Sequence, residues 1–197
     1  MNAHNTFLIV TTSFLFLTGC ANPQFTQYRK EFTPTNWRTV AILPFSGDAR
    51  FTTMAADTFT IRLLGIKSLR VIQPSQTEVS VKRLGIVATP NGCDVLEAQR
   101  IAKEIDADVV IMGVVTSHND GMTMNGFCTA KVIDAASGEI IAACHYPSGL
   151  LFGYSEHQGV VAATDRAAKD ILKILNELEA KNKLEPKKTT TKSEKSI

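Results

Sequence analysis

Ionisable and nucleophilic side chains occur along the chain, but they do not form a catalytic pattern. The four histidines, at positions 4, 118, 145 and 157, are scattered, and there is no GxSxG, P-loop, GxGxxG, HExxH or CxxC motif. His118 and Asp120 flank a predicted turn, where solvated side chains are expected in place of a metal site. Asp106 and Asp108 could act as an acid–base pair, but beside a buried strand they are expected to end a helix and to accept backbone hydrogen bonds. The sequence therefore predicts a non-enzyme without metal or cofactor.

Cys20 has a setting in which its thiol would be modified. It follows an uncharged run of eleven residues, Phe7 to Leu17, which is interrupted only by small hydroxyl residues, and then Thr18 and Gly19. Such a run has the length of a signal-peptide core and is too short for a transmembrane helix of about 20 residues. The segment resembles the lipobox of bacterial lipoproteins, in which the thiol is diacylated, the peptide is cleaved between Gly19 and Cys20, and the new amino terminus is acylated. The resemblance implies attachment to membrane lipid through Cys20.

Two other interpretations of this segment stay open: a buried strand, or a secretory signal with an incidental cysteine. Residues 1–6 carry no Lys or Arg, which departs from the usual start of a signal peptide. Ala21 stands where the sorting rule of the lipoprotein family places Asp in inner-membrane members. The resemblance therefore implies the outer membrane, with the domain in the periplasm.

The chain divides by composition into four parts. We expect a signal peptide over 1–19, a lipidated cysteine and tether over 20–36, one domain over 37–182 and a disordered tail over 183–197. Hydrophobic residues make up 44% of the chain, which is enough for one core. From Lys181 onward there are six lysines and two glutamates, a net charge of +4, and too few apolar residues to fold. We expect a solvated tail, with contact to anionic lipid or cell-wall polymer as the alternative.

Hydrophobic patterns predict an α/β fold. The expected elements are a strand at 40–43, helices at 51–66, from Ser75 to about Leu84 and at 95–105, strands at 69–73, 109–118, 122–134 and 139–145, and a helix at 156–182. Continuous apolar strands in the first half indicate parallel pairing. Asp94 is expected to cap one helix, and Ser75 with Glu78 to form a capping box on another. The turn at 119–121 and the one at 135–138 then predict an antiparallel meander. The expected architecture is a two- or three-layer sandwich with a mixed sheet and a long final helix.

Three cysteines remain after Cys20. If the second hairpin closes around Ala136, Cys128 lies opposite Cys144 on one buried face. An exported protein meets an oxidising periplasm, so a disulfide between Cys128 and Cys144 is one hypothesis and two buried thiols are the other. Cys93 would then be unpaired in a loop.

Four segments together resemble a known family: VAILPF, AQRIAKEIDADVVIMGVVTSH, VIDAASGEII and the alanine-rich final helix. They are similar to the CsgG-like domain of the curli secretion channel lipoprotein and to the amino-terminal domain of the translocation protein TolB. They are also similar to the periplasmic lipoproteins of Pel exopolysaccharide export and of penicillin-binding-protein activation. The resemblance covers about 140 residues, 38–178. It implies an anticodon-binding-domain-like α/β fold used for protein contacts or ring assembly at the outer membrane.

These observations predict a non-catalytic outer-membrane lipoprotein that acts as an assembly or export accessory, as a homo-oligomer or with an envelope protein partner. A regulator of a cell-envelope enzyme such as a peptidoglycan synthase, and a subunit of a secretion pore, stay open as alternatives. The net charge of +2 indicates no nucleic-acid partner, and no motif indicates a small-molecule substrate. The expected contact site is an apolar loop with Leu150, Leu151, Phe152 and Tyr154, for which packing against the final helix is the alternative.

Overall fold

A seven-stranded mixed sheet is the centre of the structure, a computed structural model that describes residues 24–34, 37–86, 93–119, 124–148 and 155–184. The strand order is β1-β7-β6-β5-β2-β4, with β3 beside β5. The strands are β1 Phe25–Tyr28, β2 Thr39–Ile42, β3 Ser46–Gly47, β4 Arg70–Ile72, β5 Val109–Asn119, β6 Met124–Asp134 and β7 Ile140–Pro147. The helices are α2 Thr52–Leu63, α3 Pro74–Arg83, α4 Val95–Ile105 and α5 Glu156–Leu184.

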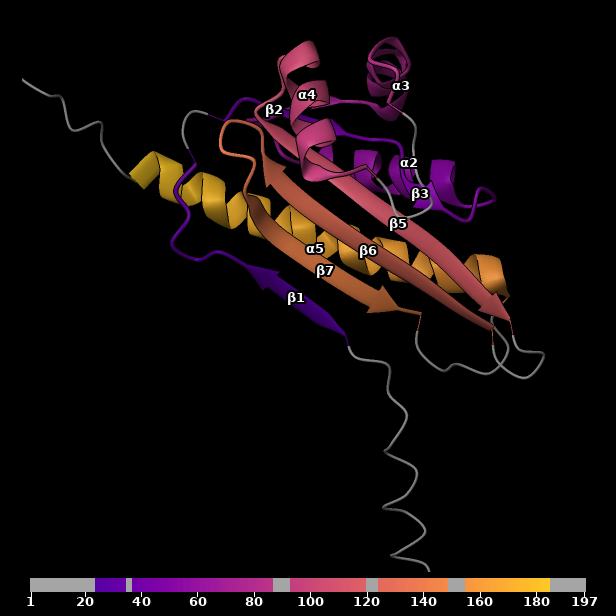
Figure 1. Cartoon of the computed structure of the whole chain (residues 1–197). Helices are drawn as coiled ribbons and strands as arrows, with labels where there is room; N and C mark the ends of the chain where they lie inside the picture. Colours follow the sequence, from indigo (N-terminus) through magenta and orange to yellow (C-terminus); the bar gives the residue numbers. More distant parts are fainter. Residues whose placement is uncertain (1–23, 35–36, 87–92, 120–123, 149–154, 185–197) are drawn as a thin grey trace, which may run out of the picture.

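Helices cover both faces of the sheet, which gives three layers and confirms the predicted α/β sandwich. One core lies between the sheet and helices α2 and α5, and a smaller core lies between the sheet and α4, with α3 beside it. Figure 1 shows α5 running along the meander on one side of the sheet and α4 lying on the other. Every residue of β2 is buried, as its continuous apolar sequence predicts.

The parallel part of the sheet forms as predicted. β2 pairs in parallel with both β4 and β5. Asp106 ends α4 in the left-handed conformation, with φ 53°. One carboxylate oxygen of Asp108 accepts hydrogen bonds from the backbone N–H groups of Arg38 and Thr39 at 2.8 and 2.9 Å. Both aspartates therefore have the structural roles expected of them.

Helix α4 begins as predicted and α3 does not. Asp94 caps α4 and forms a capping box with Glu97. In α3 the cap is Gln73, which forms the box with Gln76, so the predicted box of Ser75 and Glu78 is wrong. Pro74 occupies the first helical position, for which the fixed φ of proline is suited, and the helix begins earlier than predicted. Glu78 instead pairs with Lys82 at 2.8 Å.

The register of the second hairpin also differs from the prediction. Ala130 lies opposite Cys144, and Cys128 lies opposite Tyr146. Next to the turn, Ile133 pairs with Ile140, one position from the predicted pairing, and a register shift between Val132 and Ile133 adds a second position. In the turn itself, one carboxylate oxygen of Asp134 accepts hydrogen bonds from both the backbone N–H and the hydroxyl of Ser137, at 2.8 and 2.7 Å.

The predicted tether contains a strand, so the folded part begins before residue 37. Phe25–Tyr28 pairs antiparallel with β7 as an edge strand. Its alternate side chains bind α5: Thr26 donates a hydrogen bond to Asp170 and Tyr28 donates one to Glu177, both at 2.8 Å. Because these anchoring residues are polar, the segment shows no apolar period in the sequence.

Helix α5 contacts the sheet through backbone at a pair of glycines, Gly126 and Gly159. A Cβ on Gly126 would lie 2.3 Å from the backbone nitrogen of Val160 and 2.5 Å from the carbonyl carbon of Gly159. Ser148 binds Gly126 through two hydrogen bonds. Its N–H donates to the Gly126 carbonyl at 2.7 Å, and its hydroxyl accepts from the Gly126 N–H at 3.0 Å. The first turn of α5 is thereby fixed against β6.

Replacing Gly126 by alanine is expected to destabilise the domain by about 1–3 kcal/mol, because the added methyl group must push α5 away from a packed sheet. Urea unfolding followed by circular dichroism measures the difference. Gly65→Ala is the control, since a Cβ there would meet only the Arg62 carbonyl, at 3.3 Å. Equal stability of Gly126→Ala and the unmodified protein would contradict the proposed contact.

Candidate interaction site at the loop end of the sheet

One end of the sheet, here called the loop end, gathers several chain connections. β5 ends there, β6 begins there, β7 ends there and α5 begins there, so residues 120–123 and 149–154 connect elements at this end. Phe25 pairs with His145, so β1 also begins at the loop end. The predicted contact residues Leu150, Leu151, Phe152 and Tyr154, like Cys20, lie outside the described residues. The structure therefore describes the frame of the predicted contact site.

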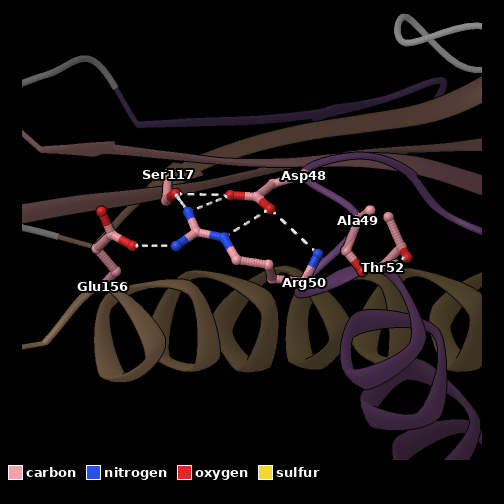
Figure 2. A network of polar contacts seen from close by, with 6 residues as sticks. All are labelled: Asp48, Ala49, Arg50, Thr52, Ser117 and Glu156. Atoms are coloured by element: carbon pink, nitrogen blue, oxygen red, sulfur yellow. Dashed lines mark hydrogen bonds and ion pairs between the residues drawn. The ribbon is translucent and has the colours of Figure 1, made fainter.

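Arg50 joins three elements of this frame. Its guanidinium donates to both carboxylate oxygens of Asp48, at 3.0 and 2.7 Å, to the Ser117 hydroxyl at 3.0 Å and to Glu156 at 2.8 Å. The Ser117 hydroxyl in turn donates to Asp48 at 2.8 Å. Figure 2 shows how the side chain spans from the segment before α2 to the first turn of α5. Arg50 thus ties the start of α5 to the end of β5.

The short strand β3 brings Arg50 to this position. Gly47 has φ +101°, and a Cβ there would lie 2.1 Å from the Val115 carbonyl oxygen, so only glycine permits this approach to β5. The N–H of Asp48 then donates to the same carbonyl at 2.8 Å. Buried Phe51 lies beneath Arg50, whose guanidinium carbon is 5.0 Å from the centre of the ring. Backbone geometry and cation–π contact together fix the arginine.

The electrostatics of the network favour a structural connector. Hydrogen bonds from Arg50 hold the pKa of Asp48 well below its usual value, against the opposing effect of burial. Hydrogen bonds to Asp48 and Glu156 likewise raise the pKa of Arg50. Four hydrogen bonds occupy a guanidinium that has five N–H donors. The arginine is therefore committed to holding the frame and is poorly placed to bind a further anion.

An aromatic stack lies on the sheet face opposite α5. The His145 ring lies between the rings of Phe25 and Phe127, with centroid distances of 5.5 and 6.1 Å. The Nδ1 of His145 and the hydroxyl of Thr129 are hydrogen-bonded at 2.9 Å. Phe25 is 46% exposed, so this stack gives an accessible aromatic surface near the loop end. The sequence did not reveal it, because three strands contribute and one of them was not predicted.

The two buried cysteines of the meander are thiols in this structure. They lie on the same buried face but two register positions apart, and not directly opposite as predicted. Burial raises the pKa of Cys144 to about 12 and that of Cys128 still further. Because the thiolate is the reactive form, both are poor nucleophiles. A disulfide between them stays a prediction, now without the register that suggested it. Burial also raises the pKa of Cys93 to about 12.

No three His, Cys, Asp or Glu side chains in the described part of the chain are grouped to hold a metal ion. No helix in that part combines the length and the apolar character needed to cross a membrane. His118 is exposed at the end of β5, and Asp120 lies outside the described residues.

Arg50→Gln is expected to destabilise the domain slightly at pH 7, because the ion pairs that it removes are exposed to solvent. The folded-state pKa of Asp48 is lowered, so its contribution is complete above the unfolded value of about 3.9 and is lost as the pH falls towards the folded value. Urea unfolding at pH 7 and pH 2.5 should therefore show a smaller difference between the two proteins in acid. An equal difference at both pH values would contradict the role of Asp48.

Comparisons with known proteins complete the description. The sequence matches no protein-family model and no curated protein. Solved structures similar to this one include the PelC dodecamer from Paraburkholderia phytofirmans, with 14% identity over 79% of this chain and 96% of that chain and a TM-score of 0.43. The LpoB carboxyl-terminal domain from Salmonella enterica has 15% identity over 60% and 85%, with a TM-score of 0.44. Lipoprotein GNA1162 from Neisseria meningitidis has 13% identity over 72% and 96%, with a TM-score of 0.48.

Proposed function

We propose that this protein is a non-catalytic lipoprotein of the outer membrane, anchored through acylated Cys20, whose domain acts in the periplasm as an assembly or export accessory. It works through protein–protein contacts made at the loop end, with further copies of itself or with another envelope protein. The lipobox-like sequence before Cys20 and the position of β1 support this proposal.

The position of β1 is the observation that carries the proposal. Only four residues separate Cys20 from Phe25, where β1 begins. That distance spans at most about 17 Å when fully extended, compared with about 50 Å for the sixteen-residue tether that the sequence suggested. An acylated Cys20 would therefore hold the loop end close to the membrane.

The loop end would then present its connections at one height above the membrane. Leu150, Leu151, Phe152 and Tyr154 belong to the connection between Ser148 and Ser155, whose ends are fixed by the Gly126 contact and by α5. When several copies are anchored in one membrane, their loops lie in one plane, which raises the effective concentration at which the loop of one copy meets that of another. A regulator of an enzyme in the opposite membrane needs a long arm, and the shortened tether disfavours that alternative.

Cys20→Ser is expected to abolish incorporation of labelled palmitate and removal of residues 1–19, because serine offers no thiol to acylate. Metabolic labelling and mass determination of the amino terminus measure both changes. Cys93→Ser is the matched control and should be acylated like the unmodified protein. Acylation of Cys20→Ser, or an unmodified Cys20 in the native protein, would refute the anchor.

The double variant Leu151→Glu and Phe152→Glu is expected to reduce assembly by more than tenfold if the loop makes the contact, because burying a carboxylate is costly. Light scattering of residues 21–197 and cross-linking of the lipidated protein in membranes report the assembled state. Ile61→Glu is the control, since Ile61 is 70% exposed on α2 and does not belong to the loop. A strict monomer in both settings would rule out self-assembly and leave a single-copy adaptor. Assembly of the double variant like the native protein would exclude this loop.

A further inference from the structure

A cleft lies at the end of the sheet opposite the loop end. It has a volume of about 680 Å³ and is separated from the loop end by the length of β5. Four parts of the chain form its walls: the segment after β1, the end of α4, the start of β5, and the turn between β6 and β7. The side chains used below are Phe32, Trp37, Lys103, Asp106, Asp108 and Asp134. We call it the turn-end cleft.

Negative charge dominates the turn-end cleft. Three aspartates line it against a single lysine, Lys103. Asp134 is buried and accepts a hydrogen bond from the indole N–H of Trp37 at 3.0 Å. Asp106 is exposed at the carboxyl end of α4, where the helix dipole adds further negative potential. The cleft therefore favours a cationic occupant.

The same cleft has an aromatic wall. The rings of Phe32 and Trp37 lie 5.6 Å apart, and Trp37 is the only tryptophan of the chain. Lysine combines an apolar stem, which packs on aromatic surface, with a charged end that seeks a carboxylate. A lysine-rich segment fits both features of the cleft.

Helix α5 delivers such a segment to this place. Near its carboxyl end the ammonium of Lys181 donates to the Lys30 carbonyl at 2.6 Å, two residues before Phe32. The chain after Leu184 contains four lysines and two glutamates, beginning with Glu185-Pro186-Lys187-Lys188. Lys188 can be about 13 Å from Leu184 along an extended chain. The basic segment thus starts beside the acidic cleft.

We propose that residues 185–197 bind in the turn-end cleft of their own chain, with Lys187 and Lys188 at Asp106 and Asp108. Because the segment is tethered, its local concentration at the cleft is in the millimolar range. Another cationic peptide must displace it, so the segment acts as a built-in competitor for the cleft. The contact is electrostatic and exposed, and it weakens as salt shortens the screening length to about 3 Å at 1 M. This proposal does not depend on lipid attachment or on contacts at the loop end.

Zero-length carbodiimide coupling of the full chain, mapped by mass spectrometry, tests the proposal. We expect amide bonds that join Lys187 or Lys188 to Asp106 or Asp108, with a yield that falls at least fivefold between 0.05 and 1 M salt, roughly as the screening length predicts. A mixture of ¹⁵N-labelled and unlabelled protein should give cross-links between peptides of the same label only. Mixed pairs would show that the segment binds a second copy and would overturn the intramolecular contact.

Asp106→Asn is the diagnostic variant, because asparagine keeps the left-handed conformation at this helix end and removes the charge. It should eliminate coupling at position 106 and lower coupling at Asp108 several-fold. Glu78→Gln is the control, since Glu78 is an exposed carboxylate on α3 outside the turn-end cleft, and its loss should leave the yield unchanged. Coupling of Lys187 and Lys188 only to Glu185 and Glu194 would overturn the proposal. So would a yield of cross-links to Asp108 in Asp106→Asn that equals the yield in the unmodified protein.

Discussion

The contact between α5 and the sheet at Gly126 and Gly159 fixes how the long helix lies on β6. At this point backbone meets backbone, because neither residue has a side chain to separate the two elements. Further along, the buried residues of α5 grow from Ala163 and Ala167 to Ile171, Leu175 and Leu178. The helix therefore meets the sheet through backbone at its first turn and packs on the sheet through larger side chains towards its end. Such a close backbone contact leaves almost no space for a larger side chain at either glycine.

Polar groups reinforce the geometry that the glycine contact sets. Arg50 fixes the first turn of α5 from the side, through Glu156 and Ser117. At the other end of the helix, β1 holds Glu177 through Tyr28. Between these points Asp170 accepts hydrogen bonds from Thr26 and Tyr146. Burial and the bond to Asp170 raise the pKa of Tyr146, which keeps its hydroxyl protonated as a donor. The helix is thus held by apolar contact on one side and by charged groups along its edges.

Local signals in the sequence were sufficient for much of the fold. The bounds of α4 and its cap at Asp94 follow from residues that are neighbours in the chain, and the buried parallel strands follow from continuous apolar runs. Prediction from the sequence failed where the contact that determines the structure joins residues far apart along the chain. β1 is recognisable only through Asp170 and Glu177, about 145 positions away. The predicted register of the second hairpin did not include the shift between Val132 and Ile133. Arg50 was missed because Asp48, Ser117 and Glu156 come from three separate segments. Cys20 and the loop residues Leu150 to Tyr154 stay predictions.

The distance along the chain between β1 and its partners has a consequence for the order of folding. Thr26 and Tyr146 are 120 positions apart, so a chain that emerges from its amino end contains β1 long before β7 and α5 exist. Contacts of such large sequence separation form late, because closing the loop between them costs entropy. Until then residues 25–28 have no strand to pair with. Closure of β1 onto β7 is therefore expected to be the last step of folding.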